Sequence, residues 1–106
     1  MSAEADAVRL AELQDAILDR ETLGRLFFDL SQLAVIVEVR IKGGTAQHAS
    51  GASATLDDAR AMMESGTALG VQIRYRLGSA EWIDTLLRTT GERVRLVRIQ
   101  VPGVAT

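Results

Sequence analysis

Three apolar runs near the C-terminus constrain the fold of this chain more than any other feature of its sequence. Residues 70–101 contain runs of strand length that are rich in β-branched, leucine and aromatic residues, and Gly78-Ser79 and Thr90-Gly91 separate these runs. Short apolar runs separated by glycine-containing turns are typical of antiparallel hairpins. The sequence therefore predicts a three-stranded antiparallel meander, with strands near 70–77, 80–88 and 93–101.

The length of the first turn decides which side chains share a face of the meander. A two-residue turn at Gly78-Ser79 would put Asp84 in the same apolar row as Tyr75. A three-residue turn over 78–80 would keep that row apolar and would pair Asp84 with Arg74. Because an unpaired carboxylate in an apolar row is costly, the three-residue turn is favoured over the two-residue turn.

One face of this predicted meander is polar and has an aromatic centre. A three-residue loop over 89–91, with Gly91 in the left-handed region, would close the second hairpin. The candidate binding residues on the polar face are Arg74, Arg76, Trp82, Asp84 and Arg98. Trp and Arg are enriched at interface centres, although a solvated face with cross-strand ion pairs is the alternative. Asp84 is expected to form a salt bridge, with Arg74 as the first candidate partner and Arg98 as the second.

The N-terminal third has the spacing of amphipathic helices. One apolar stripe predicts a helix over 4–19, and a second, offset stripe predicts another helix that ends near Leu33. Asp19 or Thr22 would cap the second helix, and one long bent helix is the alternative. Phe27 and Phe28 are adjacent and point about 100° apart on a helix, so both cannot be buried easily on one stripe. Phe28 is therefore a candidate for a partner surface.

The middle of the chain reads as a strand, a loop and a helix. Alternating valine and isoleucine predict a half-buried strand near 34–42, and the small, glycine-rich segment 43–55 predicts a loop. Thr55 would cap a helix over 56–65, which Gly66 would end. The whole chain is thus expected to be a single α+β domain over residues 1–106, with helices packed on one face of a mainly antiparallel sheet.

In this order of elements the chain resembles a reduced form of the NTF2-like cone fold. The resemblance is one of topology, with no sequence motif and no catalytic residues to transfer. It implies a pocket between the sheet and the helices, and with it the alternative of a small-molecule-binding protein or an enzyme. Asp84 and Arg74 would line that pocket, together with His48 or Tyr75.

The residues that usually carry chemistry are sparse in this sequence. There is no cysteine, and His48 is the single histidine, too few ligands for a zinc site. The segment 42–45, KGGT, lacks the spacing of a phosphate-binding loop, because its lysine precedes the glycines. We therefore expect no metal, no cofactor and no catalytic residues.

Charge and hydropathy narrow the class of partner. The net charge is −2, which argues against nucleic acid, and no apolar run has the roughly 18 residues of a membrane helix. The acidic N-terminus has no apolar segment typical of a signal peptide, so a cytoplasmic location is expected. The sequence favours a non-catalytic interaction or accessory protein, acting as a homo-oligomer such as a homodimer or as a small subunit of a larger complex.

Overall fold

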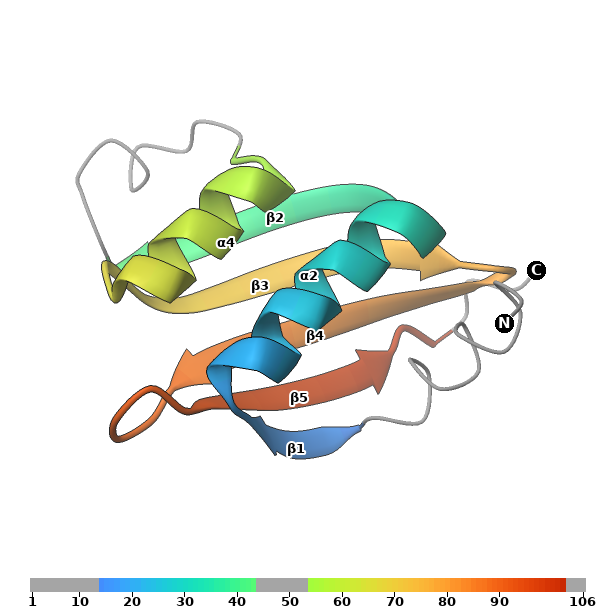
Figure 1. The fold of residues 1–106 in the computed structure, drawn as a ribbon. Coiled ribbons are helices and arrows are strands. Elements are labelled where there is room, and N and C mark those ends of the chain that lie inside the picture. The colour runs from blue at the N-terminus through green and yellow to red at the C-terminus, as the bar shows by residue number, and fades with distance from the viewer. Residues whose placement is uncertain (1–13, 44–53, 103–106) are drawn as a thin grey trace.

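The structure is a computed structural model that describes residues 14–43 and 54–102 (Figure 1). These residues form five strands and two helices. In chain order the elements are β1 (Asp15–Leu18), α2 (Arg20–Leu33), β2 (Val35–Gly43), α4 (Leu56–Ser65), β3 (Ala68–Leu77), β4 (Ala80–Arg88) and β5 (Val94–Gln100). The α+β class expected from the sequence is confirmed.

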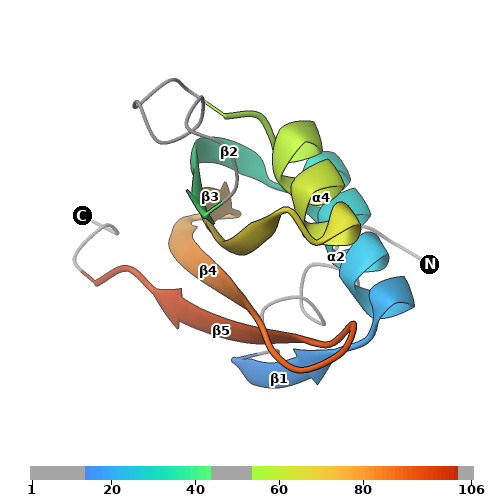
Figure 2. The same cartoon turned by 90° about the vertical axis from the view of Figure 1, so that its left-hand side faces the viewer.

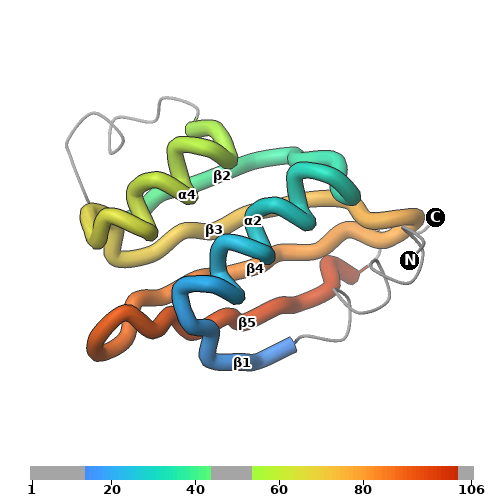
Figure 3. The backbone as a smooth tube through the Cα atoms, in the orientation of Figure 1, coloured from blue at the N-terminus to red at the C-terminus, as the bar shows by residue number. Residues whose placement is uncertain are grey.

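All five strands belong to one antiparallel sheet with the order β1-β5-β4-β3-β2. The predicted meander is β3, β4 and β5, and β1 and β2 form the two edges. Helix α2 crosses the sheet from one edge strand to the other (Figure 3). Both helices pack on the same face of the sheet, so that in the described part of the chain the opposite face has no covering layer (Figure 2).

Local sequence signals begin and end the two helices. Asp19 caps α2, because its carboxylate accepts a hydrogen bond from the backbone N–H of Thr22 at 2.8 Å. Thr55 and Asp58 form a reciprocal capping box at the start of α4. Gly66 ends α4 in the left-handed region, with a φ of 80°, which suits a residue without a Cβ.

The helix predicted over 4–19 is wrong for its described part. Asp15–Leu18 is strand β1, which pairs antiparallel with β5, and residues 1–13 lie outside the described residues. In β1, Leu18 is buried and its neighbour Ile17 is exposed, which is the alternation of a strand. A four-residue segment has little helical preference of its own, so pairing with the edge of β5 decides its conformation.

The core lies between the two helices and the sheet. Helix α2 contributes Leu23, Leu26, Phe27 and Leu30, and α4 contributes Ala59 and Met63. They cover a row of buried side chains on the strands, which includes Val71, Ile73, Tyr75, Leu86, Val94 and Leu96. Phe27 is buried and Phe28 is 57% exposed, as the angle between adjacent helical residues predicts.

The register of the first hairpin differs from the favoured one. The turn has two residues, Gly78 has a φ of 64°, and Tyr75 pairs with Trp82. Asp84 therefore lies opposite Ile73, in the apolar row that faces the helices. The two-residue turn was disfavoured because it would leave Asp84 unpaired in an apolar row. In the structure, Arg98 on β5 lies directly opposite Asp84 and neutralises its charge.

The second hairpin also differs from the prediction. Five residues, 89–93, separate the strands instead of three, and Arg88 pairs with Val94. The N–H and the hydroxyl of Thr89 both donate to the carbonyl oxygen of Arg93, at 3.0 and 2.9 Å. These two bonds close the wider loop, which the three-residue interpretation of 89–91 did not anticipate.

Candidate functional site

The six residues singled out from the sequence lie in three places. Trp82, Asp84 and Arg98 face the helices, while Arg74 and Arg76 belong to the opposite side of the sheet. Phe28 is exposed on α2. The single polar face predicted from the sequence is wrong. The turn is one residue shorter than the favoured one, so every side chain of β4 and β5 lies on the opposite face relative to β3.

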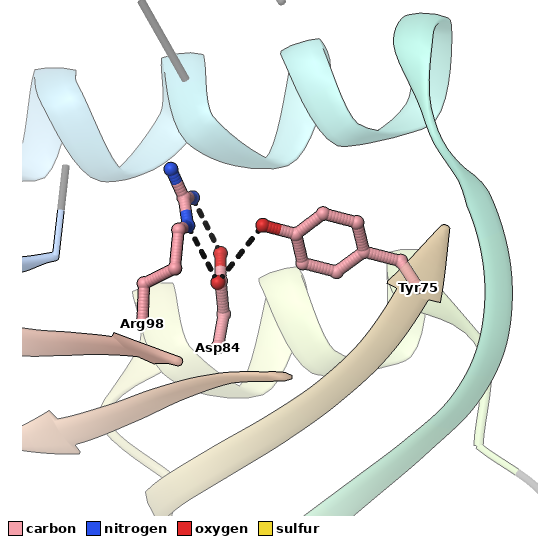
Figure 4. A network of polar contacts seen from close by, with 3 residues as sticks. All are labelled: Tyr75, Asp84 and Arg98. Carbon is pink, nitrogen blue, oxygen red and sulfur yellow. Dashed lines mark hydrogen bonds and ion pairs between the residues drawn. The ribbon is translucent and has the colours of Figure 1, made fainter. Parts of the chain in front are cut away.

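A buried polar cluster of Tyr75, Asp84 and Arg98 lies beneath helix α2 (Figure 4). The carboxylate of Asp84 accepts hydrogen bonds from Nε of Arg98 at 2.7 Å and from Nη2 at 2.6 Å. The phenol of Tyr75 donates to the same carboxylate at 2.9 Å. Asp84 is thus held by a bidentate ion pair and one further donor, each from a different strand.

The buried cluster has no net charge. The charges of Asp84 and Arg98 cancel, and the guanidinium also lies 5.9 Å from the centre of the Tyr75 ring. Burial, and then the negative charge of Asp84, raise the pKa of the Tyr75 phenol far above its ordinary value of 10.0. The Tyr75 phenol therefore keeps its proton and donates a hydrogen bond to Asp84.

One donor of the cluster has no acceptor. Nη1 of Arg98 is buried and makes no hydrogen bond within the described structure. Both carboxylate oxygens of Asp84, by contrast, are occupied, and the side chain is 0% exposed. The cluster can hold three strands in register, but its carboxylate has no open side for a substrate.

The side of the sheet away from the helices, here called the open face, has an aliphatic half. Strands β1, β5 and β4 place aliphatic side chains there, and the registers put Ile83 opposite Ile99. These side chains are Ile17, Ile83, Leu87, Val97 and Ile99. Three of them are well exposed: Ile99 at 55%, Ile17 at 52% and Leu87 at 42%. Arg95 lies between Ile17 and Leu87 and pairs with Asp15 at 3.0 Å, so this half combines the aliphatic side chains with one ion pair.

The other half of the open face, on β3 and β2, is here called the cationic half. Its charged residues are Arg40, Lys42, Arg74 and Arg76, with Glu38 and with Glu81 from β4. Glu81 binds both Arg74 and Arg76, the latter at 3.6 Å. The hydrogen bond from Arg74 holds the pKa of Glu81 below its usual range.

The structural roles of two residues were not predicted from the sequence. Tyr75 was placed in an apolar row and named as a candidate residue of the alternative pocket, although an isolated tyrosine in an apolar row is a signal for a buried hydrogen-bond acceptor nearby. Arg88 donates to the carbonyl oxygens of Met63 and Ala68, and so ties the end of α4 to β4. A cation at a helix C-terminus is favourable, but no local sequence signal links residues 63 and 88.

Neither a metal site nor a membrane-spanning helix is found in the part of the chain that the structure describes. The described ranges contain no cluster of three acidic or histidine side chains that could hold a metal ion, and His48 lies outside them. None of their helices is long and apolar enough to cross a membrane. Comparison with protein-family models, with curated proteins and with solved structures gives no match.

Proposed function

We propose that this chain is a non-catalytic interaction protein that binds another protein through the open face of its sheet. The observation that carries the proposal is the exposed aliphatic half around Ile17, Leu87 and Ile99. Single exposed apolar residues are common, but several aliphatic side chains gathered on three adjacent strands of one face are typical of an interaction site. The bound protein is either a second copy of this chain or a larger subunit.

The edges of the sheet support the face as the binding surface. Strand β2 has a bulge between Ile36 and Glu38, and carries Glu38, Arg40 and Lys42 along its edge. Strand β1, at the other edge, has four residues. Bulges, charges and short length are the usual means by which sheets prevent edge-to-edge pairing. Over its aliphatic half the open face carries one ion pair, Asp15 with Arg95, which adds no net charge.

The buried cluster supports a non-catalytic role over a pocket-based one. A catalytic Asp84 would have to reach a substrate, yet its carboxylate is fully buried and bonded to Arg98 and Tyr75. A catalytic acid or base must lie within hydrogen-bond reach of the proton that it transfers. Asp84 is more simply explained as a structural residue.

The test compares two substitutions that each add one lysine, one to the open face of the sheet and one to the helix layer. Ile99→Lys places a lysine in the aliphatic half, and Gln32→Lys places one on the exposed side of α2. Light scattering gives the mass of each pure protein, and quantitative affinity capture gives its stoichiometric partners. We expect Ile99→Lys to lose the association and Gln32→Lys to keep it. A third variant, Phe28→Lys, tests the exposed phenylalanine of α2 and should also keep it. If Ile99→Lys retains the wild-type mass and partners, the proposal is wrong.

A further inference from the structure

We infer that the open face binds an acidic amphipathic helix of a partner protein, in preference to a second copy of this chain. The inference rests on the proposed function and specifies the chemistry of the partner. It follows from the charge of the cationic half, from its position beside the aliphatic half, and from the shape of the uncovered sheet.

The cationic half has more positive than negative charge. It holds four cations, Arg40, Lys42, Arg74 and Arg76, and two acids, Glu38 and Glu81, which leaves two positive charges in excess. Glu38 pairs with Arg40 at 3.1 Å, and the single carboxylate of Glu81 serves both Arg74 and Arg76. Within the described residues, Lys42 has no ion pair. The surplus therefore lies on Lys42 and on the Arg74–Arg76 pair.

The aliphatic half requires that the partner also has apolar side chains. Ile83 and Ile99 lie between the cationic half and strand β1, so a partner that covers the face contacts both halves at once. Acidic residues beside an apolar stripe match this surface. Nucleic acid would neutralise the cations, but the aliphatic half offers its bases no aromatic side chain on which to stack.

An amphipathic helix fits the shape of the open face. The opposite face is already covered by two helices, so a helix on the open face would complete a three-layer arrangement (Figure 2). Strand β4 has nine residues and is about 30 Å long, which corresponds to a helix of roughly 20 residues. Such a helix would place its apolar stripe on β4 and β5 and its acids toward β3 and β2.

A second copy of the chain matches this surface less well. Each copy would bring the same excess of two positive charges on its open face, and a symmetric contact between open faces would contain four. An acidic partner removes the excess instead of doubling it. Charge complementarity of this kind determines which partner is accepted.

The test selects helical ligands from a displayed library of random peptides of about 20 residues, a length taken from the strand geometry. The whole chain is the target, and Ile99→Lys is the counter-selection target. We expect the enriched peptides to combine leucine or isoleucine at helical spacing with Asp and Glu. The tightest peptide is then synthesised, and its dissociation constant is measured by fluorescence anisotropy at low and high salt.

Matched variants separate the two parts of the surface. Arg76→Glu with Lys42→Glu reverses the excess charge at exposed positions, and we expect affinity to fall about tenfold or more, which is ~1.4 kcal/mol or more. The same peptide with its acids changed to lysine should regain affinity for this variant. Gln32→Lys should bind the acidic peptide as the wild type does.

Each other outcome overturns the inference in a distinguishable way. If no peptide is enriched, or if basic peptides are, the acidic helix is wrong. If the wild type dimerises and Ile99→Lys abolishes the dimer, the proposed function stands and the occupant is a second copy. Binding of anionic vesicles or of polyadenylate, weakened by the two glutamate substitutions, would replace the helix by a lipid surface or a nucleic acid. If Ile99→Lys changes nothing, the inference and the proposed function fail together.

Discussion

Each face of this sheet carries some residues of the kind usually expected on the other face. The helix-facing side buries an aspartate and an arginine, and the open face exposes isoleucine and leucine. The buried charges are stable because each finds its partner on a neighbouring strand, whereas the exposed aliphatic residues have no covering layer in the described structure. The difference teaches that residue type alone does not assign a face, and that the register of the strands does.

The largest expected effect is on the buried ion pair. Asp84→Ala should lower the free energy of unfolding by about 3–5 kcal/mol, because it leaves the Arg98 guanidinium buried without a counter-charge. Urea unfolding followed by the fluorescence of Trp82 measures this. The double variant Asp84→Leu with Arg98→Leu should be more stable than Asp84→Ala, since no charge is then buried. A small loss for Asp84→Ala would mean that this face is open to water.

Two isoleucines on opposite faces of the sheet test the comparison directly. Ile73 is 0% exposed under the helices, and Ile99 is 55% exposed on the open face. Ile73→Ala should cost about 2–5 kcal/mol of stability, whereas Ile99→Ala should cost less than about 1 kcal/mol, because little apolar surface leaves the interior. Equal losses in chemical denaturation would indicate that Ile99 is buried in solution, as in a tight homodimer.

Alkaline pH should act on the helix-facing side through Tyr75. Its pKa is raised in the folded state, so its contribution to stability is complete below pH 10 and is lost as the pH rises further. We expect the free energy of unfolding to fall by ~1.4 kcal/mol per pH unit above that point. The chain has one tyrosine, so absorbance at the phenolate band reports Tyr75 alone. A phenolate that forms near pH 10 while the circular dichroism stays native would contradict the buried hydrogen bond.

The smallest expected effect is on the open face. The pKa of Glu81 is lowered in the folded state by its hydrogen bond from Arg74, so its contribution to stability is present above pH 4.5 and is lost as the pH falls further. Arg74→Ala should move the pKa of Glu81 upward with little change in stability at neutral pH. Carboxyl chemical shifts in an NMR titration measure both proteins. An unchanged pKa would show that Arg74 does not hold Glu81 in solution.

Much of the fold could be predicted from the sequence because its signals are local. The position of the first turn, the caps Asp19 and Thr55 and the stop at Gly66 each depend on a few adjacent residues, and each lies where a local signal puts it. The length of that turn was wrong, because three residues were favoured and the structure has two, and Thr22 was an alternative to Asp19 as the cap. Strand β1 could not be predicted in the same way. Its conformation depends on pairing with β5, about 80 residues further along the chain.

The candidate site could be predicted only in part, for a related reason. Asp84 and Arg98 were recognised as partners of interest, but their pairing depends on the registers of two hairpins together. Cross-strand pairs differ by only ~0.2–1 kcal/mol, too little to choose one hairpin register in isolation. The choice becomes clear once Arg98 is opposite Asp84, which is information from a third strand.

The two-residue turn at Gly78-Ser79 also limits how this sequence can diverge. A one-residue slip in the pairing of β3 with β4 would turn β4 and β5 over relative to β3, so that Asp84 and Arg98 would enter water and Ile83 and Ile99 would lie under the helices. A residue inserted in the loop itself only widens the loop and keeps every pair, whereas a residue inserted within β3 or β4 shifts the pairs beyond it. In lineages that descend from this sequence, insertions should therefore occur in the loop and not within these two strands.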